Sequence, residues 1–441
     1  MTTTTPARRI SAATAAGLVR SGDWVDYGAV LAQPDAFDTA LAARVAELDD
    51  VRFRGCLSTR PRSVVEADPD RRHFSFFNWH LSAYDRRQCD AGMQNYIPSN
   101  LGEIPDYYRR FIDPTDLMVI KTCPLDERGY FNFGASNLWH GAAASRAKVV
   151  IAEVDPALPY VHGIENGLHR DQVDYVIDGE GAPLPELPLV EATDVDRAVA
   201  TLIAAEIEDG ACLQIGIGAM PNTVCTLLLE SGVRNLGIHT EMLTDGIIDL
   251  YKAGIANGSV KTMYPGKIVC SFGLGSKSTY DAIHDNPDIS FQPVDLTNLQ
   301  KYVVRNDRLT AINNTTQMDL QGQASSESDG HRHISGTGGQ LQFVRGAYAS
   351  NGGKSFLCMS SIYERNGVRR SRIVLDLTPG NVVTVPRSDM MYIVTEYGLI
   401  NLKGRSIPER AKAMISVAHP DFRDDLEREA RASGLIPRSF R

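Results

Sequence analysis

Short apolar runs rich in β-branched residues alternate along the chain with stretches in which apolar residues recur every three or four positions. The runs at residues 148–154, 268–272 and 391–395 are typical of buried strands, whereas residues 195–207 and 408–415 have the spacing of helices. Strands that are apolar throughout belong mostly to parallel sheets with helices on both faces. The pattern therefore predicts an α/β fold with largely parallel sheets.

One order of elements occurs twice. In the first copy, an Ala-rich helical stretch leads to a strand-like run between Gly22 and Gly28. In the second copy, a helical stretch leads to a run between Gly210 and Gly216, with the same spacing between the two glycines and a proline soon afterwards. The repetition predicts two related open α/β domains.

The clearest break between the two copies is proline-rich. Residues 181–188 contain three prolines, which favour an extended, solvated connector. We place the boundary near residue 190, so that the predicted domains are residues 1–190 and 191–441, the second of which carries the candidate nucleophile described below.

A glycine turn follows the strand of the second copy. Gly216 and Gly218 allow close approach to the backbone, and Pro221 suits the first turn of the helix that follows. Amide groups at such a helix start can hold a phosphate or an oxyanion, and the side chain of Gln214 could assist. A packing turn is an equally good reading of the glycines, and Gln214 could equally be an ordinary strand residue. A dinucleotide-binding fold is disfavoured, because Pro221 stands where its fingerprint has Gly or Ala.

Glu241 is the candidate nucleophile. It follows the apolar run 236–240, and α/β folds present functional groups at the carboxyl ends of their strands. A carboxylate can attack an activated carbonyl and form a covalent intermediate. For an arbitrary glutamate, a cap or a salt bridge would be the ordinary role.

The chain resembles the acetyl-CoA hydrolase/transferase family of family I CoA-transferases over nearly its whole length. Within that family, the butyryl-CoA:acetate and 4-hydroxybutyrate CoA-transferases are the most similar branches. The motifs that carry the resemblance occur in one order, at residues 21–28, 129–134, 216–221, 239–242, 245–246, 312–314, 334–340 and 394–398.

The resemblance implies that the active site lies between the two α/β domains. It implies that Glu241 attacks an acyl-CoA thioester and then carries coenzyme A as a glutamyl-CoA thioester in a ping-pong reaction. It also implies that coenzyme A, which is a substrate, contacts Gly216, Ile217, Gly218, Ala219, Met220, Asn314, Thr316 and Gly339. We expect Gln214 and the turn amides to stabilise the tetrahedral oxyanion. No metal and no further cofactor are required.

The expected activity is transfer of coenzyme A from a short-chain acyl-CoA to a small carboxylate such as acetate, as part of short-chain fatty acid metabolism. The alternatives are an acyl-CoA hydrolase and a non-catalytic acyl-CoA binding protein. The acyl group is left open, since Ala29 and Leu31 differ from the resembled enzymes and Arg60 and Arg62 leave room for a dicarboxylate such as succinate.

The composition of the chain limits the kinds of molecule that it is expected to bind. The 441 residues are 43% hydrophobic and carry a formal charge of −9, which gives no reason to bind nucleic acid or an anionic membrane. Positive charge for coenzyme A must therefore be local, and Arg345 and Lys354 are candidates, although ordinary surface roles are favoured. The seven cysteines form no C-x-x-C pair, which argues against a disulfide framework or a zinc site. No apolar leader or membrane span is present, so we expect a cytoplasmic enzyme, and by resemblance a homo-oligomer.

Overall fold

The computed structural model describes residues 7–188 and 190–440. The chain divides into two compact units that are not continuous in sequence. Unit 1 contains the chain up to Leu187 together with Glu241–Thr244 and Val269–Leu299. Unit 2 contains the remaining segments, which are Pro188–Thr240, Asp245–Ile268 and the chain from Gln300 onward.

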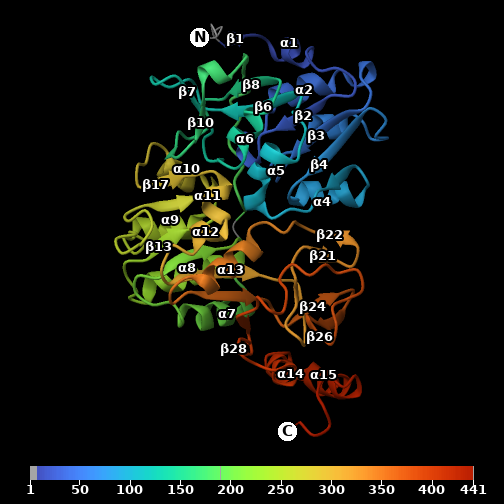
Figure 1. Cartoon of the computed structure of the whole chain (residues 1–441), viewed down its shortest axis with the longest axis vertical. Helices are drawn as coiled ribbons and strands as arrows, with labels where there is room; N and C mark the ends of the chain where they lie inside the picture. Colours follow the sequence, from blue (N-terminus) through green and yellow to red (C-terminus); the bar gives the residue numbers. More distant parts are fainter. Residues whose placement is uncertain (1–6, 189, 441) are drawn as a thin grey trace. The chain divides into compact units, whose positions relative to one another are not determined.

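Unit 1 is built on a parallel sheet (Figure 1). Within residues 7–187, eight strands lie in the order β1-β11-β8-β6-β2-β3-β4-β5, and all neighbouring pairs are parallel. The strands are β1 (Arg8–Arg9), β2 (Trp24–Tyr27), β3 (Val51–Gly55), β4 (Phe74–Asn78), β5 (Gln94–Tyr96), β6 (Leu117–Thr122), β8 (Val149–Val154) and β11 (Tyr175–Asp178).

The remaining elements of unit 1 are short. Its helices are α1 (Ala12–Ala16), α2 (Ala36–Ala42), α3 (Ser63–Glu66), α4 (Ala83–Asp90), α5 (Ile104–Arg110), α6 (His140–Ala144), α10 (Lys277–Ile283) and α11 (Val294–Asn298). Four 3₁₀ turns are described, η1 (Val30–Ala32), η2 (Val45–Glu47), η3 (Leu101–Glu103) and η4 (Arg170–Gln172). Further strands are β7 (Tyr130–Asn132), β9 (His162–Gly163), β10 (Gly167–His169), β14 (Met242–Leu243), β16 (Phe272–Gly273) and β17 (Ile289–Phe291).

Unit 2 also contains a mostly parallel sheet, with strands in the order β28-β27-β23-β18-β12-β13. All neighbouring pairs in this run are parallel except β27 and β28. These strands are β12 (Cys212–Ile215), β13 (Gly237–His239), β18 (Leu309–Asn314), β23 (Lys354–Cys358), β27 (Tyr392–Thr395) and β28 (Gly398–Asn401). The chain passes from unit 2 to unit 1 within β15 (Ile268–Cys270).

The helices of unit 2 are longer. They are α7 (Asp194–Ala204), α8 (Ala219–Glu230), α9 (Asp245–Lys252), α12 (Gln300–Val303), α13 (Gln340–Ala349), α14 (Ile407–Ser416) and α15 (Pro420–Ala432). Its small strands are β19 (Gln317–Asp319), β20 (Ala324–Ser325), β21 (Ser328–Asp329), β22 (Arg332–His333), β24 (Ile362–Arg365), β25 (Val368–Ser371) and β26 (Ile373–Val374). Helix α7 starts with a capping box, in which Thr193 and Asp196 bond each other's backbone amides.

The two predicted glycine turns occupy equivalent positions. The strands that precede the two turns are β2 and β12. Strand β2 lies between β6 and β3, and β12 lies between β18 and β13. In each sheet, the direction of the strand order therefore reverses at this strand. Ligands of open α/β sheets bind at the carboxyl ends of strands at such reversal points. The α/β fold with large parallel sheets is confirmed, and each unit presents one of its turns where this fold class places ligands.

The units differ from a simple division of the chain at residue 190. The segment that contains Ser271 and Phe272 is hydrogen-bonded both to the carbonyl of Glu241 and to residues 135–137 of the N-terminal half. These backbone bonds are why Glu241–Thr244 and Val269–Leu299 group with unit 1, although the sequence predicted that Glu241 belongs to the second domain. The boundary near residue 190 stays a prediction.

Candidate active site

Glu241 lies between β13 and β14 at the end of the buried run predicted from the sequence. The His239 and Thr240 side chains that precede it are fully buried. Its backbone carbonyl accepts hydrogen bonds from the amides of Ser271 and Phe272, at 3.0 and 3.1 Å. Met242 continues the chain into a parallel pair with Phe272. The backbone from which the carboxylate projects is therefore fixed within unit 1.

The Glu241 carboxylate is held by a buried polar chain. Nδ2 of Asn298, the last residue of α11, donates a hydrogen bond of 2.5 Å to Oε2 of Glu241. Oδ1 of Asn298 accepts a 3.0 Å bond from the hydroxyl of Thr297, which also bonds the hydroxyl of Ser271. Asn298, Thr297 and Ser271 are each 0% exposed. Because the Asn298 oxygen is used by Thr297, the amide group must present its nitrogen to the carboxylate.

Asn298 and Thr297 were not predicted from the sequence. Asn298 stands 57 positions after Glu241, in a short helix that no motif marks. Its only signal is a Thr-Asn pair between two leucines, Leu296 and Leu299. The contact with Glu241 arises when the chain folds back to bring the end of α11 beside β14.

The turn after β2 is fixed by buried groups of unit 1. The backbone amide of Ala29 donates to Nε2 of His140 at 2.9 Å, and the Ser136 hydroxyl donates to the Ala29 carbonyl at 2.7 Å. Burial lowers the pKa of His140 to about 3, so the ring is neutral and accepts this bond. Val30, at a φ of 56°, adopts the left-handed conformation that β-branched residues rarely take. These contacts give His140 a structural role at the turn.

Cys56 connects this turn electrostatically to Glu241. Its carbonyl accepts the Val30 amide at 3.1 Å, and its side chain is fully buried. Burial raises the pKa of the Cys56 thiol well above its usual value, and the negative charges of Asp85 and Glu241 raise it further. Cys56 therefore stays a protonated thiol.

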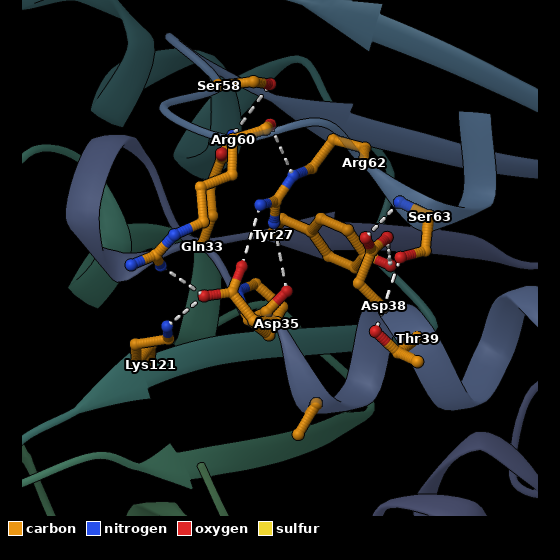
Figure 2. A network of polar contacts seen from close by, with 12 residues as sticks. Tyr27, Gln33, Asp35, Asp38, Thr39, Ser58, Arg60, Arg62, Ser63 and Lys121 are labelled. Atoms are coloured by element: carbon orange, nitrogen blue, oxygen red, sulfur yellow. Dashed lines mark hydrogen bonds and ion pairs between the residues drawn. The ribbon is translucent and has the colours of Figure 1, made fainter. Parts of the chain in front are cut away.

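Arg60 and Arg62 take part in a separate, neutralised cluster (Figure 2). Arg62 donates to Oδ1 of Asp35 at 2.8 Å, and Arg60 and Lys121 donate to Oδ2 at 2.6 and 2.5 Å. Burial by itself would raise the pKa of Asp35, but the charges of Arg62 and Lys121 hold it below its usual value. Arg62 is 1% exposed. Its charge is used to stabilise the fold, so the room for a dicarboxylate that the sequence suggested is not formed by Arg62.

The predicted coenzyme A contacts come together in unit 2. Gly216, Ile217 and Gly218 form the loop between β12 and α8, and Ala219 and Met220 are the first residues of α8. Asn314 ends β18, and its Nδ2 donates to the Ile217 carbonyl at 3.3 Å.

The second predicted glycine segment joins the same group. Gly339 is the N-cap of α13, and the next residue, Gln340, donates from Nε2 to the Asn314 carbonyl at 2.6 Å. Gly218 has a φ of 120°, a conformation that glycine adopts without strain. Three segments far apart in sequence therefore meet at the carboxyl ends of β12 and β18.

A cavity of about 520 Å³ lies beside these residues in unit 2. Four of the predicted coenzyme A contacts, Ala219, Met220, Asn314 and Thr316, form part of its wall. The rest of the wall comes from Thr193, Val195, Asp196, Val199, Thr315, Cys358, Met359, Ser360 and Arg372. The cavity is large enough for part of a cofactor-sized ligand.

Gln214 is 4% exposed and forms a reciprocal pair with Asn313. Its Oε1 accepts from Asn313 at 2.8 Å, and its Nε2 donates to Asn313 at 3.2 Å. The pair ties the ends of β12 and β18 together. This contact gives Gln214 a structural role at the glycine turn, and its predicted role toward an oxyanion stays a prediction.

Among residues 7–188 and 190–440, no group of three or more His, Cys, Asp or Glu side chains is arranged to hold a metal ion. Over the same residues, no helix is long and apolar enough to cross a membrane.

Comparisons with known proteins match almost the whole chain. Residues 3–188 match the acetyl-CoA hydrolase/transferase N-terminal domain, and residues 275–430 match the corresponding C-terminal domain. The chain is 43% identical to the butyryl-CoA:acetate CoA-transferase of Anaerostipes caccae, over 96% of this chain and 95% of that protein. It is 40% identical to the 4-hydroxybutyrate coenzyme A transferase of Clostridium kluyveri, over 81% and 82%. The crystal structure of RipA from Yersinia pestis superposes with a TM-score of 0.89 at 34% identity and covers 97% of this chain and 98% of that one. The chain belongs to the acetyl-CoA hydrolase/transferase family.

Proposed function

We propose that this protein is a CoA-transferase that moves coenzyme A from a short-chain acyl-CoA to a small carboxylate such as acetate, with Glu241 as the nucleophile. The observation that carries the proposal is the Glu241 carboxylate held by Asn298 at the end of a buried hydrogen-bond chain. Family membership, and relatives at 40–43% identity that are named CoA-transferases, support the reaction class.

The chemistry needs only a fixed carboxylate. A Glu241 oxygen attacks the thioester carbonyl, the C–S bond breaks, and coenzyme A leaves as a thiolate from an acyl-glutamyl anhydride. The thiolate then attacks the glutamyl carbonyl, which releases the first carboxylate and leaves a glutamyl-CoA thioester. An incoming carboxylate reverses these steps. Because one thioester replaces another, little free energy is lost overall. Asn298 fixes one oxygen of the Glu241 carboxylate and thereby orients the other oxygen for attack.

The proposed coenzyme A contacts are Gly216, Ile217, Gly218, Ala219, Met220, Asn314, Thr316 and Gly339. Four of them line one cavity, and hydrogen bonds of Asn314 join the glycine loop and the start of α13 to it, which supports the assignment. We also assign the turn amides and Gln214 to the oxyanion, since Nε2 of Gln214 has a second N–H beyond the one that bonds Asn313. Coenzyme A is a substrate in this scheme and carries the activated bond. Location in the cytoplasm and a homo-oligomeric state are retained as predictions from the sequence.

The acyl pocket favours a short monocarboxylate. Ala29, Val30 and Leu31 line the turn at the end of β2 with small or medium apolar side chains and are nearly fully buried. The cations that could have recognised a second carboxylate are already bound to Asp35. We therefore propose acetate and butyrate as better partners than succinate.

The test is to trap the intermediate. The protein is incubated with butyryl-CoA and reduced with borohydride, and the modified peptide is identified by mass spectrometry. Reduction of Glu241 to the alcohol is expected, and modification at another residue would remove the assignment. CoA release is measured in parallel with and without acetate. Release that does not depend on acetate would indicate a hydrolase instead.

A further inference from the structure

The cavity of unit 2 contains one arginine, Arg372, that sequence reasoning did not select. It connects β25 to β26, directly after the β24–β25 hairpin. Its Nη1 donates to the carbonyl of Thr316 at 2.9 Å, and its Nε donates to the hydroxyl of Ser360 at 3.2 Å. Its guanidinium also lies 5.1 Å from the ring centre of Tyr363. The guanidinium is therefore fixed against two residues of the cavity wall, one of them a proposed coenzyme A contact.

The charge of Arg372 has no neutralising ion pair within residues 7–188 and 190–440. Over the described residues, no carboxylate lies within ion-pair distance of its guanidinium. The acid whose charge influences it is Glu396, whose oxygens accept from the amide and hydroxyl of Ser361 at 2.8 and 2.6 Å. Burial lowers the pKa of Arg372. A partly desolvated cation without a counter-ion is costly unless a ligand supplies the negative charge.

The other cations considered for this role have acidic partners. Arg345 forms an ion pair with Asp389 at 2.9 Å, and Lys354 forms one with Glu206 at 3.0 Å. The acid in the cavity wall is Asp196, whose Oδ2 accepts from the amide and hydroxyl of Thr193 at the start of α7. Asp196 is therefore engaged with its helix start, and Arg372 supplies the positive charge of the cavity.

The hairpin extends this positive face. Arg370 is the direct cross-strand partner of Tyr363, whose ring Arg372 covers. Arg369, the residue before Arg370, belongs to the other face of β25 and pairs with Asp421 at 3.2 Å. Two arginines and a tyrosine thus lie together at one border of a cavity whose wall also carries Val195, Val199, Met220 and Met359.

We propose that this cavity binds the 3′-phospho-ADP end of coenzyme A, with Arg372 as a direct contact to a phosphate group. The inference rests on the proposed function, since it names the residue that recognises the charged end of that substrate. Arg372 supplies positive charge locally, which allows a protein with a formal charge of −9 to bind a polyanion.

The experiment compares two substrates that differ only in that end. KM and kcat are measured for butyryl-CoA and for butyryl-pantetheine, which has the same thioester but lacks the nucleotide, with wild type and Arg372→Met. Removal of one charge-assisted contact should raise KM for butyryl-CoA by about 10- to 100-fold. KM for butyryl-pantetheine should stay unchanged. Arg372→Lys should recover part of the loss, because it retains the charge without the planar donor group.

Arg369→Met is the matched control, since it removes a nearby arginine of β25 that lies on the other face of the hairpin. Its two KM values should both stay at the wild-type level. If Arg372 only supports the loop, Arg372→Met will raise both KM values together, and this result would overturn the inference. An unchanged KM for butyryl-CoA would also overturn it. Failure of the wild type to transfer coenzyme A would instead contradict the proposed function, so the two failures are distinguishable.

Discussion

Asn298 and Glu241 are joined by a hydrogen bond in which the amide is the donor, because an ionised carboxylate can only accept, while the amide oxygen faces the hydroxyl of Thr297. A buried amide that is fixed in this way restricts the rotamers of the carboxylate without neutralising its charge. The pair is therefore suited to hold a nucleophile rather than to form a permanent salt bridge.

We predict that Asn298→Ala lowers kcat by about 10- to 100-fold while KM for acyl-CoA changes little, since the carboxylate loses orientation and coenzyme A contacts are untouched. Asn298→Asp should shift the rising limb of the pH–rate profile to higher pH, because a second negative charge raises the pKa of the Glu241 carboxyl. Steady-state kinetics over a range of pH check both. Equal increases in KM without loss of kcat would contradict the positioning role.

Glu241→Gln should reduce exchange between butyryl-CoA and acetate by about 10³-fold or more, because the amide cannot form the anhydride. Affinity for CoA should stay within about threefold of the wild type. Calorimetric titration with CoA and an exchange assay measure the two quantities, and intact mass excludes deamidation back to glutamate. Full activity of a verified amide variant would rule out the covalent route.

Glu153 predicts a pH dependence of stability in unit 1. Its carboxylate accepts the amides of Asp35, Ala36 and Phe37 at the start of α2, yet burial raises its pKa to about 7, above the usual value of 4.5. The folded state thus holds a proton that the unfolded state has already released between pH 4.5 and 7. The contribution of this group to the free energy of unfolding is greatest below pH 4.5 and declines as the pH rises to about 7.

The decline attributable to Glu153 is on the order of a few kcal/mol at most, reduced by the positive charge of Lys121 nearby. Urea unfolding at pH 5 and pH 8 measures it. Glu153→Gln should flatten the difference between the two pH values, whereas Glu66→Gln, at a partly exposed acid of the same unit, should leave it as in the wild type. If the free energy of unfolding of Glu153→Gln differs between pH 5 and pH 8 as much as that of the wild type, the pH dependence does not come from Glu153.

The ion pairs of Asp35 predict that replacing Arg62 lowers the free energy of unfolding more than replacing Arg60 does. Arg62→Met leaves Asp35 and Asp38 buried beside fewer cations, and it should reduce the free energy of unfolding by about 3–5 kcal/mol. Arg60→Ala removes a partly exposed cation of the Asp35 cluster and should lower the free energy of unfolding by about 1 kcal/mol or less. In Arg60→Ala, the ratio of acetate to succinate turnover should equal that of the wild type. A marked loss of succinate use relative to acetate would restore Arg60 as a specificity residue.

Local pattern predicted several elements well because their determinants are close in sequence. The apolar runs at residues 149–154 and 392–395 form β8 and β27, and the capped, amphipathic stretch after Thr193 forms α7. Residues 382–385, Val-Val-Thr-Val, have the composition of a strand but form only an isolated bridge through Val385 to Ala324. Val382 and Val383 are exposed there, so their β-branched side chains had no sheet to pack against.

By itself, the sequence determined the α/β class, the two glycine turns and the position of Glu241 after a buried strand, because periodicity and motifs are properties of neighbouring residues. Tertiary structure decided that Asn298 holds Glu241 and that Asp35 neutralises Arg62. It also decided that Arg372 lines the cavity with Thr316 and finds no carboxylate partner in the part of the chain that the structure describes. These relationships join residues far apart in the chain. Whether a charged side chain is neutralised or available depends on which groups the fold brings beside it, and that is set by packing rather than by local pattern.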